Sequence, residues 1–272
     1  MRAIKAILIR NLKGFIRNRM RLIFTFVFPF FLLFIFSFAM KMAPGGLMQP
    51  INYLLSGIII MTVFQTALNN SMDIIEDIAS GFMKEIIVAP LPRWQISIGQ
   101  VLSSMTIAVI QGLIILIISF FIGLKLDFFH TIEIIGIMIL VGFTFSSIGL
   151  FLATMTKSSS AFQVMVTVIA MPLTLISGAL IPVTSMPGIL RPVIFFNPLS
   201  YTASIFRFIS LKMENLSAQE LLKQGVSFQL GKLIITPQIS LLIIILMNIL
   251  FFALCVYRFN RSDFSKVKVF KH

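Results

Sequence analysis

Six apolar runs without a charged residue dominate this chain and restrict its fold more than any other feature. A helix of about 20 apolar residues crosses the hydrocarbon core of a bilayer. A soluble domain covers its core with polar residues, whereas 58% of this chain is hydrophobic and 11% is charged. The sequence therefore predicts an all-α polytopic integral membrane protein with six transmembrane helices. We expect the spans at Leu22–Met40, Ile51–Met72, Ile96–Leu124, Ile134–Thr156, Ala161–Ile181 and Leu233–Tyr257.

The basic residues are distributed unevenly around these spans. With six spans, both termini lie on the same side of the membrane, together with fifteen of the 22 basic residues. The positive-inside rule then predicts cytoplasmic N- and C-termini, in a multi-pass protein of the plasma membrane. The same rule explains the net charge of +13, so we expect a lipid bilayer as partner and no nucleic acid.

The spans lack the side chains that most membrane-embedded chemistry needs. None has an aspartate, glutamate, lysine, arginine or histidine in its interior, whereas ion-coupled carriers usually bind their ion with such groups. Intramembrane enzymes need a nucleophile with a base, or a metal, and no such constellation is visible. The two histidines, His130 and His272, are far apart in the sequence and show no metal-ligand spacing. We expect no catalytic residue, no metal and no enzymatic activity in this chain.

Residues 1–21 form the first of two predicted cytoplasmic helices. The segment has seven basic residues and no acidic one. At helical spacing its apolar residues share one side and most basic residues lie roughly opposite. The apolar side consists of Ile4, Leu8, Leu12 and Phe15. This pattern is typical of a basic amphipathic helix on an anionic membrane surface.

Residues 73–92 are predicted to form the second cytoplasmic helix, between spans two and three. One side is an apolar stripe and the other is polar, with Asp73 and Asp77 on it. The stripe consists of Ile75, Ile78, Phe82 and Ile86. The helix either lies on lipid or docks a soluble partner, and its acidic side favours docking because the inner leaflet is anionic. The chain has no phosphate-binding G-x-x-x-x-G-K-[ST] loop, so ATP and Mg²⁺ would be bound by a separate ATPase, with no cofactor here.

The stretch Ile176–Arg207 begins as a span and is then broken by four prolines while remaining apolar. These are Pro182, Pro187, Pro192 and Pro198. Proline disfavours a continuous helix, and irregular backbone at membrane depth is tolerated only in protein or beside a water-filled cavity. We expect 182–232 to form a re-entrant segment on the outer side that lines the exit path.

Small residues follow one stripe of the fourth span. They are Gly142, Ser146, Gly149 and Ala153. Small residues at this spacing let helices approach closely. Packing within the subunit is the favoured interpretation, and contact between two subunits is the alternative.

An ordered set of residues within the broken stretch resembles a known family. The set is Ser177, Gly178, Pro182, Pro187, Asn197, Pro198, Leu199, Tyr201 and Arg207. In this set the chain resembles permeases of the type 2 class of ATP-binding-cassette exporters, in the drug and polysaccharide exporter group. A second, weaker match is the loop pattern of Glu76, Gly81, Glu85, Pro90 and Gly99. The family commonly has an aromatic residue where this chain has Ile181.

The resemblance implies a half-transporter, one permease domain over 1–272 that pairs with a second permease, identical or paralogous, and with two cytosolic ATPase subunits. It would move a hydrophobic or amphipathic compound outward, such as a drug, a lipid-like molecule or a peptide antibiotic. The implied ATPase-coupling residues are Glu76, Asp77, Gly81, Phe82, Glu85, Pro90 and Pro92. The implied exit-gate residues are those of the ordered set without Leu199, together with Arg191. A non-transporting immunity or sensor subunit that docks a cytosolic partner is the alternative.

Overall fold

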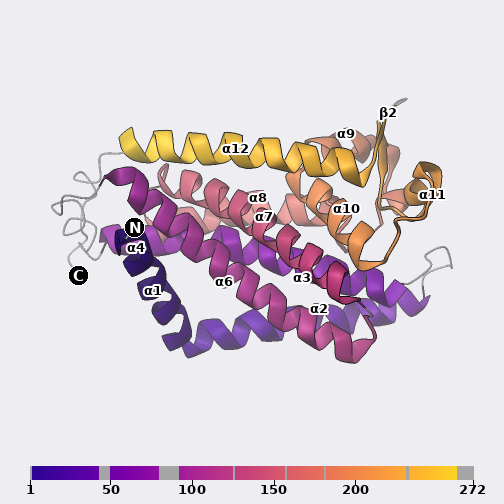
Figure 1. Cartoon of the computed structure of the whole chain (residues 1–272), viewed down its shortest axis with the longest axis horizontal. Coiled ribbons are helices and arrows are strands. Elements are labelled where there is room, and N and C mark those ends of the chain that lie inside the picture. The colour runs from indigo at the N-terminus through magenta and orange to yellow at the C-terminus, as the bar shows by residue number, and fades with distance from the viewer. Residues whose placement is uncertain are drawn as a thin grey trace.

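The computed structural model describes residues 2–42, 50–79, 92–124, 126–156, 158–180, 182–230 and 233–261. Within these ranges the chain is a bundle of long helices with a smaller, irregular part at one end (Figure 1). Five of the described helices are long and apolar enough to cross a membrane, and the bent pair α1–α2 makes a sixth if counted as one span. The prediction of an all-α polytopic membrane protein is confirmed.

Long helices occupy the predicted spans. The elements outside the broken stretch, including the N-terminal helix and the short η1 and α4, are α1 (Arg2–Arg17), α2 (Arg19–Met42), α3 (Pro50–Asn69), η1 (Asn70–Met72), α4 (Asp73–Ala79), α6 (Arg93–Ile122), α7 (Phe128–Ala153), α8 (Ser159–Ile176) and α12 (Pro237–Arg261). The shorter elements lie between α8 and α12. They are η2 (Val183–Ser185), η3 (Gly188–Leu190), α9 (Arg191–Phe196), α10 (Pro198–Ser210), α11 (Ala218–Lys223), β1 (Phe228–Leu230) and β2 (Leu233–Ile235).

Helix α3 lies at the centre of the core, in contact with α6, α7, α10 and α2. Its close packing depends on interlocking side chains. The rings of Phe64 and Phe145 meet edge to face with centroids 4.5 Å apart. Gly112 of α6 leaves room for Val63, because a Cβ atom at Gly112 would lie 2.5 Å from a methyl carbon of that valine. Apolar side chains of α8 and α12, in contrast, are widely exposed, as expected for surfaces that face lipid or another subunit.

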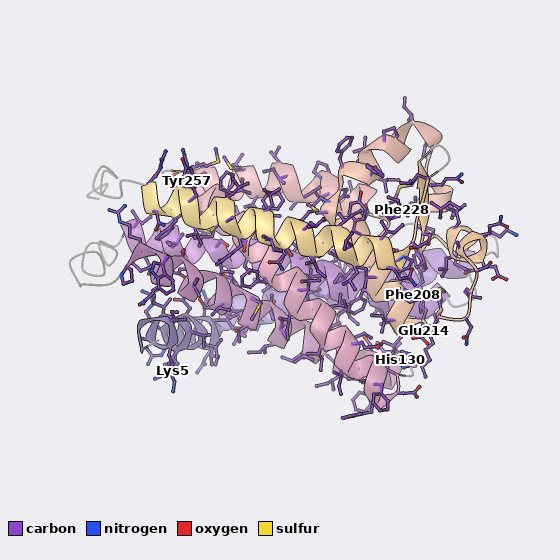
Figure 2. All side chains as sticks on the ribbon, turned by 45° about the horizontal axis from the view of Figure 1, so that its top comes forward. Lys5, His130, Phe208, Glu214, Phe228 and Tyr257 are labelled. Atoms are coloured by element: carbon purple, nitrogen blue, oxygen red, sulfur yellow. The ribbon has the colours of Figure 1, made fainter. Side chains whose placement is uncertain are left out.

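The two ends of the bundle differ in character. Helix α1, helix α4, the start of α6 and the end of α12 share one end, and α9, α11 and the strands occupy the other (Figure 1). Arg93 joins the first group, since its Nη1 donates to the carbonyl oxygen of Asn260 at 3.0 Å. In Figure 2, Lys5 and Tyr257 mark this end, and Phe228, Glu214 and His130 lie toward the opposite one.

Helix α1 is amphipathic as predicted, and the face that it buries in the bundle is rotated from the predicted apolar side but shares Phe15 with it. Ile7, Asn11 and Phe15 are buried, whereas Ile4 and Leu8 are only partly covered. The reason is that α1 packs on α6, where Gly99 leaves space for Ile7. A polar asparagine fits this face because α6 supplies hydrogen-bond partners for it. Apolar periodicity alone does not reveal such a partner.

The sixth span starts at Pro237, the proline that the sequence places near the start of the span within the apolar run Leu233–Tyr257. The preceding residues Leu233–Ile235 form β2, which pairs antiparallel with β1 so that Phe228 lies opposite Ile235. Proline suits the first turn of a helix and disfavours helical geometry in the residue before it, and isoleucine favours strands. These local preferences account for the hairpin.

The predicted loop helix at 73–92 is described only at its two ends. Asp73–Ala79 forms α4, which follows α3 through the short turn η1, and Pro92 precedes the first residue of α6. Helix α3, η1 and the start of α4 together form one apolar helical stretch, Ile51–Ile78. Four predicted coupling residues lie outside the described residues: Gly81, Phe82, Glu85 and Pro90.

Candidate functional site

The broken stretch is fastened to α3 by the buried side chain of Arg207. Arg207 lies in α10 and is 1% exposed. Its Nη2 donates a hydrogen bond of 2.5 Å to the carbonyl oxygen of Ala179, and its Cζ lies 3.5 Å from the ring centroid of Tyr53 on α3. A buried cation is costly unless it is paired, and here a carbonyl dipole and an aromatic face supply the compensation. The guanidinium thus satisfies a carbonyl at the helix break.

Gly57 of α3 makes this contact possible. A Cβ atom at Gly57 would lie 1.8 Å from the carbonyl oxygen of Ala179 and 3.2 Å from Nη2 of Arg207. Only a residue without a side chain lets the broken stretch approach α3 so closely. Gly178 completes the turn with φ +80°, a conformation that side-chain-bearing residues rarely adopt.

Side chains of the broken stretch satisfy the backbone groups that its breaks leave free. Ser177 Oγ donates to the carbonyl of Thr174 at 2.8 Å and accepts from the backbone N–H of Ala179 at 3.0 Å. Asn197 caps two helices: its Nδ2 donates to Leu173 O of α8 at 2.7 Å, and its Oδ1 accepts from Leu199 N of α10 at 2.9 Å. These are the groups that a helix end leaves without an intrahelical partner.

The remaining residues of the set divide between core and surface. The hydroxyl of Tyr201 donates to the carbonyl of Phe195, and Pro198 occupies the first turn of α10, where proline is favoured. Pro182 is buried and Pro187 is exposed, near Ile189, which is 84% exposed. Most of the set therefore holds the broken stretch against the rest of the bundle. Arg191 begins α9.

A cavity lies between α2, α3 and α6, apart from this set. Its volume is about 310 Å³. One wall is apolar, with Phe24, Phe28, Pro29, Leu32, Ile58 and Met61. The other wall is polar, with Thr62, Gln65, Thr66, Asn69, Asn70 and Gln111. The sequence of the spans alone does not reveal a polar pocket, and the structure shows this one.

The polar wall offers hydrogen-bonding groups but no charge. The hydroxyl of Thr66 donates to Oε1 of Gln111. Oδ1 of Asn69 is buried and accepts no hydrogen bond from the described residues, so it can accept one from a ligand. None of the described lining residues is charged. The spacing of Thr62, Thr66 and Asn69 by four and three residues, with an amide inside the third span, is the sequence signal for this wall.

A polar network at the other end links α1, α4 and α6. The guanidinium of Arg10 pairs with Asp77 of α4 and donates to Oδ1 of Asn11 at 2.8 Å. Asn11 Nδ2 donates to Gln100 Oε1 at 2.6 Å and to Ser103 Oγ at 2.9 Å, both on α6. Asp77, predicted to face a partner, thus points into the bundle. Glu76, the other predicted coupling residue of α4, is exposed.

The small-residue stripe of α7 faces its neighbours within the subunit. A Cβ atom at Gly142 would lie 3.2 Å from Cγ of Met105 on α6, and one at Gly149 would lie 2.7 Å from the carbonyl oxygen of Leu68 on α3. The backbone oxygen of Ser146 accepts from the hydroxyl of Ser71 at 3.3 Å, and Ala153 is buried. These contacts occupy the stripe inside one subunit.

Several known proteins are similar to this chain. The putative transport permease ycf38 of Cyanophora paradoxa is 30% identical over 157 residues, which are 56% of this chain and 53% of that protein. The probable multidrug ABC transporter permease YbhR of Escherichia coli is 29% identical over 161 residues, 57% and 42% of the two chains. The inner membrane transport permease YhhJ of Escherichia coli is 24% identical over 220 residues, 80% and 52%. The chain spans about half the length of these relatives.

The sequence profile of one family covers most of the chain. The profile of the ABC-2 type transporter matches residues 2–211, from the start of α1 to the residue that ends α10. This range contains the polar network of α1 and α4, the cavity and the Arg207 contact. The chain therefore belongs to the ABC-2 type transporter family.

Proposed function

We propose that this chain is the membrane subunit of an exporter that moves neutral hydrophobic or amphipathic compounds outward, driven by a separate cytosolic ATP-binding-cassette ATPase. The observation that carries the proposal is the cavity between α2, α3 and α6, which has an apolar wall, a polar wall and no charged lining residue among those described. A compound with an apolar body and a few polar groups matches both walls. The similar protein YbhR, a probable multidrug ABC transporter permease, agrees with this substrate class.

The end formed by α1 and α4 is the cytoplasmic end in this proposal. It holds most basic residues of the described helices, and cytoplasmic segments carry the excess of lysine and arginine. The part from α9 to β2 then faces outward. The protein lies in the cell membrane with both termini in the cytoplasm.

The network of α1, α4 and α6 is the proposed route by which ATPase closure reaches the membrane. Arg10 joins α1 to α4, and Asn11 joins α1 to α6, so the three helices move together when one is displaced. Exposed Glu76 is the contact to the ATPase on the described part of α4. A second permease subunit, the same chain or a paralogue, completes the transport path beside these helices.

Filling the cavity is expected to stop transport without dissociating the complex. In Thr62→Trp the indole occupies space that substrate needs and removes a hydroxyl from the polar wall. ATP-dependent uptake of a neutral amphipathic dye into inverted vesicles that contain the permease and its ATPase is expected to fall at least about tenfold, a loss equivalent to about 1.4 kcal/mol. Ile117→Trp, on an exposed face of α6, is the matched control and keeps the wild-type rate. Wild-type uptake that continues without ATP would reject an ATP-driven mechanism.

Reversing the acidic charge of the loop helix is expected to weaken ATPase binding. The double variant Glu76→Lys with Glu85→Lys turns an attractive electrostatic contact into a repulsive one, which costs several kcal/mol when charges face each other. The test co-expresses the tagged permease with each cytosolic ATP-binding-cassette ATPase of the same cell and measures the amount retained on purification. Glu220→Lys, at the opposite end of the bundle, is the control. Equal retention by all three proteins contradicts this docking surface.

A further inference from the structure

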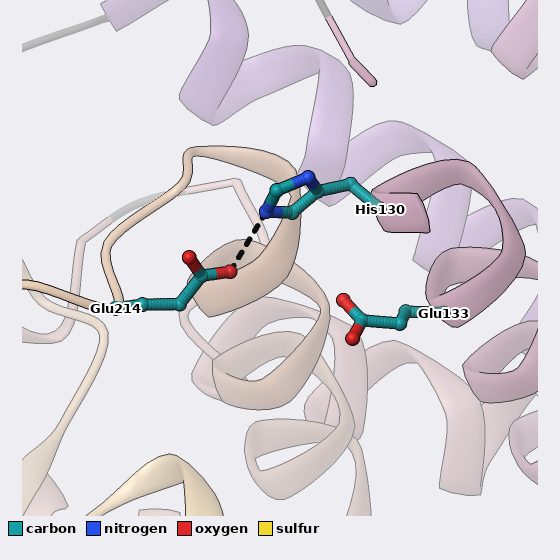
Figure 3. Close-up of side chains that lie close together, drawn as sticks. All are labelled: His130, Glu133 and Glu214. Atoms are coloured by element: carbon teal, nitrogen blue, oxygen red, sulfur yellow. Dashed lines mark hydrogen bonds and ion pairs between the residues drawn. The ribbon is translucent and has the colours of Figure 1, made fainter. Parts of the chain in front are cut away.

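Three side chains that can ligate a metal meet at the end of the bundle opposite α1. His130 and Glu133 lie on the first turns of α7, and Glu214 follows α10. Nε2 of His130 is 2.8 Å from Oε1 of Glu214, and one ligand atom of each residue lies within 4.8 Å of the others. Figure 3 shows the imidazole directed at Glu214, with the carboxylate of Glu133 beside this pair.

The turn after α10 brings Glu214 to this position. Lys212 adopts φ +52°, while Lys212 N donates to Ile209 O at 3.1 Å and Met213 N donates to Phe208 O at 3.0 Å. This pair of bonds is a Schellman motif, in which a glycine usually occupies the left-handed position. The Nζ atom of Lys212 also bonds Asp127 Oδ2 at 2.7 Å, just before α7. The ion pair holds the turn against the helix, so Glu214 reaches His130 across 84 positions of sequence.

We propose that His130, Glu133 and Glu214 bind a divalent transition-metal ion, with Zn²⁺ as the ion that fits this donor set. Zinc is commonly held by imidazole nitrogen and carboxylate oxygen, with water completing a tetrahedral shell. Bonds of about 2.1 Å place the donors of such a shell about 3.4 Å apart. Rotation of the exposed carboxylates of Glu133 and Glu214 closes the present separation, because both side chains reach solvent.

The surroundings of the cluster favour a cation over a plain surface ion pair. Lys212 already pairs with Asp127, whereas Glu133 makes no hydrogen bond or ion pair with any other described residue. Two carboxylates thus face one imidazole. Nδ1 of His130 is buried, makes no hydrogen bond within the described chain, and lies 3.7 Å from Oδ2 of Asp127. A carboxylate behind a ligating histidine orients the ring toward a metal.

A bound ion would crosslink α7 to the turn after α10. That turn continues the helix that carries Arg207, so the ion would fasten the outer part of the permease at a second point. Zinc binding involves this chain alone and does not depend on the proposed substrate or ATPase. Failure of zinc binding therefore leaves the transport proposal standing, and failure of transport leaves the metal site standing.

The test measures Zn²⁺ binding to the full chain, purified through a tag without histidine and carrying His272→Ala, so that His130 is the only histidine. Chelator-treated protein in lipid nanodiscs is titrated with ZnCl₂ by calorimetry, and bound metal is counted by mass spectrometry. One ion per chain is expected. His130→Ala and Glu214→Gln are each expected to weaken binding at least about tenfold, and excess Mg²⁺ or Ca²⁺ is not expected to displace zinc because both ions prefer oxygen ligands.

Glu220→Gln is the matched control, a carboxylate at the same end that is already used. Its oxygen accepts from the N–H and hydroxyl of Ser217 at 2.8 and 2.7 Å, which holds the pKa of this carboxyl below its usual value. Glutamine keeps this capping box, and zinc affinity stays that of the parent protein. If His130→Ala fails to fold, the exposed and nearly isosteric change Glu133→Gln tests the metal site in its place. Zinc affinity that is unmeasurable in the parent, or equal in the parent and in the variants of all three ligands, overturns the proposal.

Discussion

Gly57→Ala is expected to be the most destabilising single-methyl change in the described core. The added carbon would lie 1.8 Å from the carbonyl oxygen of Ala179, which is backbone and cannot rotate away. Relief requires the broken stretch to retreat from α3, and the bond between Arg207 and Ala179 is lost with it. Overpacking and the lost charge-assisted hydrogen bond together are expected to lower the free energy of unfolding by about 3 kcal/mol or more. Thermal unfolding in detergent, followed by loss of the monodisperse peak on size exclusion, measures the effect.

The control for Gly57→Ala is another glycine within a helix. At Gly136 of α7, no heavy atom lies within 4 Å of the position that a Cβ atom would take, so Gly136→Ala meets no neighbour. Alanine is the better helix former by about 1 kcal/mol, and this variant is expected to be as stable as the parent or slightly more stable. A melting temperature for Gly57→Ala equal to that of Gly136→Ala would show that Ala179 does not approach α3 so closely.

Arg207→Ala is expected to destabilise the permease by about 3 kcal/mol, because it leaves a cavity and an unsatisfied carbonyl. Arg207→Met fills most of the volume and removes a buried charge, so its loss is expected to be smaller. Hydrogen exchange should locate the damage, with faster exchange in 177–190 than in α7. Melting temperature and exchange together separate the anchoring of this segment from a general loss of stability.

Arg261 provides the comparison for Arg207, since it makes the same kind of contact in an exposed position. Its Cζ lies 4.5 Å from the ring centroid of Tyr257 near the end of α12. Cation–π pairs at exposed sites contribute about 0.5–1 kcal/mol, and desolvated pairs about 2 or more. Arg261→Ala should therefore cost much less than Arg207→Ala. Equal losses for the two variants contradict the assignment of Arg207 as a buried anchor.

The features that were predictable from sequence are those set by local chemistry. Uninterrupted apolar runs predicted the spans, because backbone groups in lipid must be satisfied within a helix. Four prolines predicted a break after the span Ala161–Ile181, and the structure has two short 3-10 turns and two helices there, although α8 already ends at Ile176. The break of this segment was predictable. Its anchor was not, since burial of Arg207 depends on a glycine 150 positions away.

The features that escaped prediction depend on contacts between distant elements. Asn11 is polar yet buried, because Gln100 and Ser103 of α6 accept its hydrogen bonds, so the apolar pattern of α1 did not reveal the face that packs on α6. The cavity needs α2, α3 and α6 together, and no single span reveals it. The roles of the coupling and exit-gate residues stay predictions that the experiments above address.

The double cap formed by Asn197 has a mechanical consequence. The side-chain amide of Asn197 caps the end of α8 and the start of α10. If either helix tilted alone, one of these hydrogen bonds would break, and its loss is costly because Asn197 is buried away from water. The two helices are therefore expected to move as one bent unit with a fixed angle between them. A displacement of the longer helix α8 would then rotate the shorter helix α10, because the two cannot move independently.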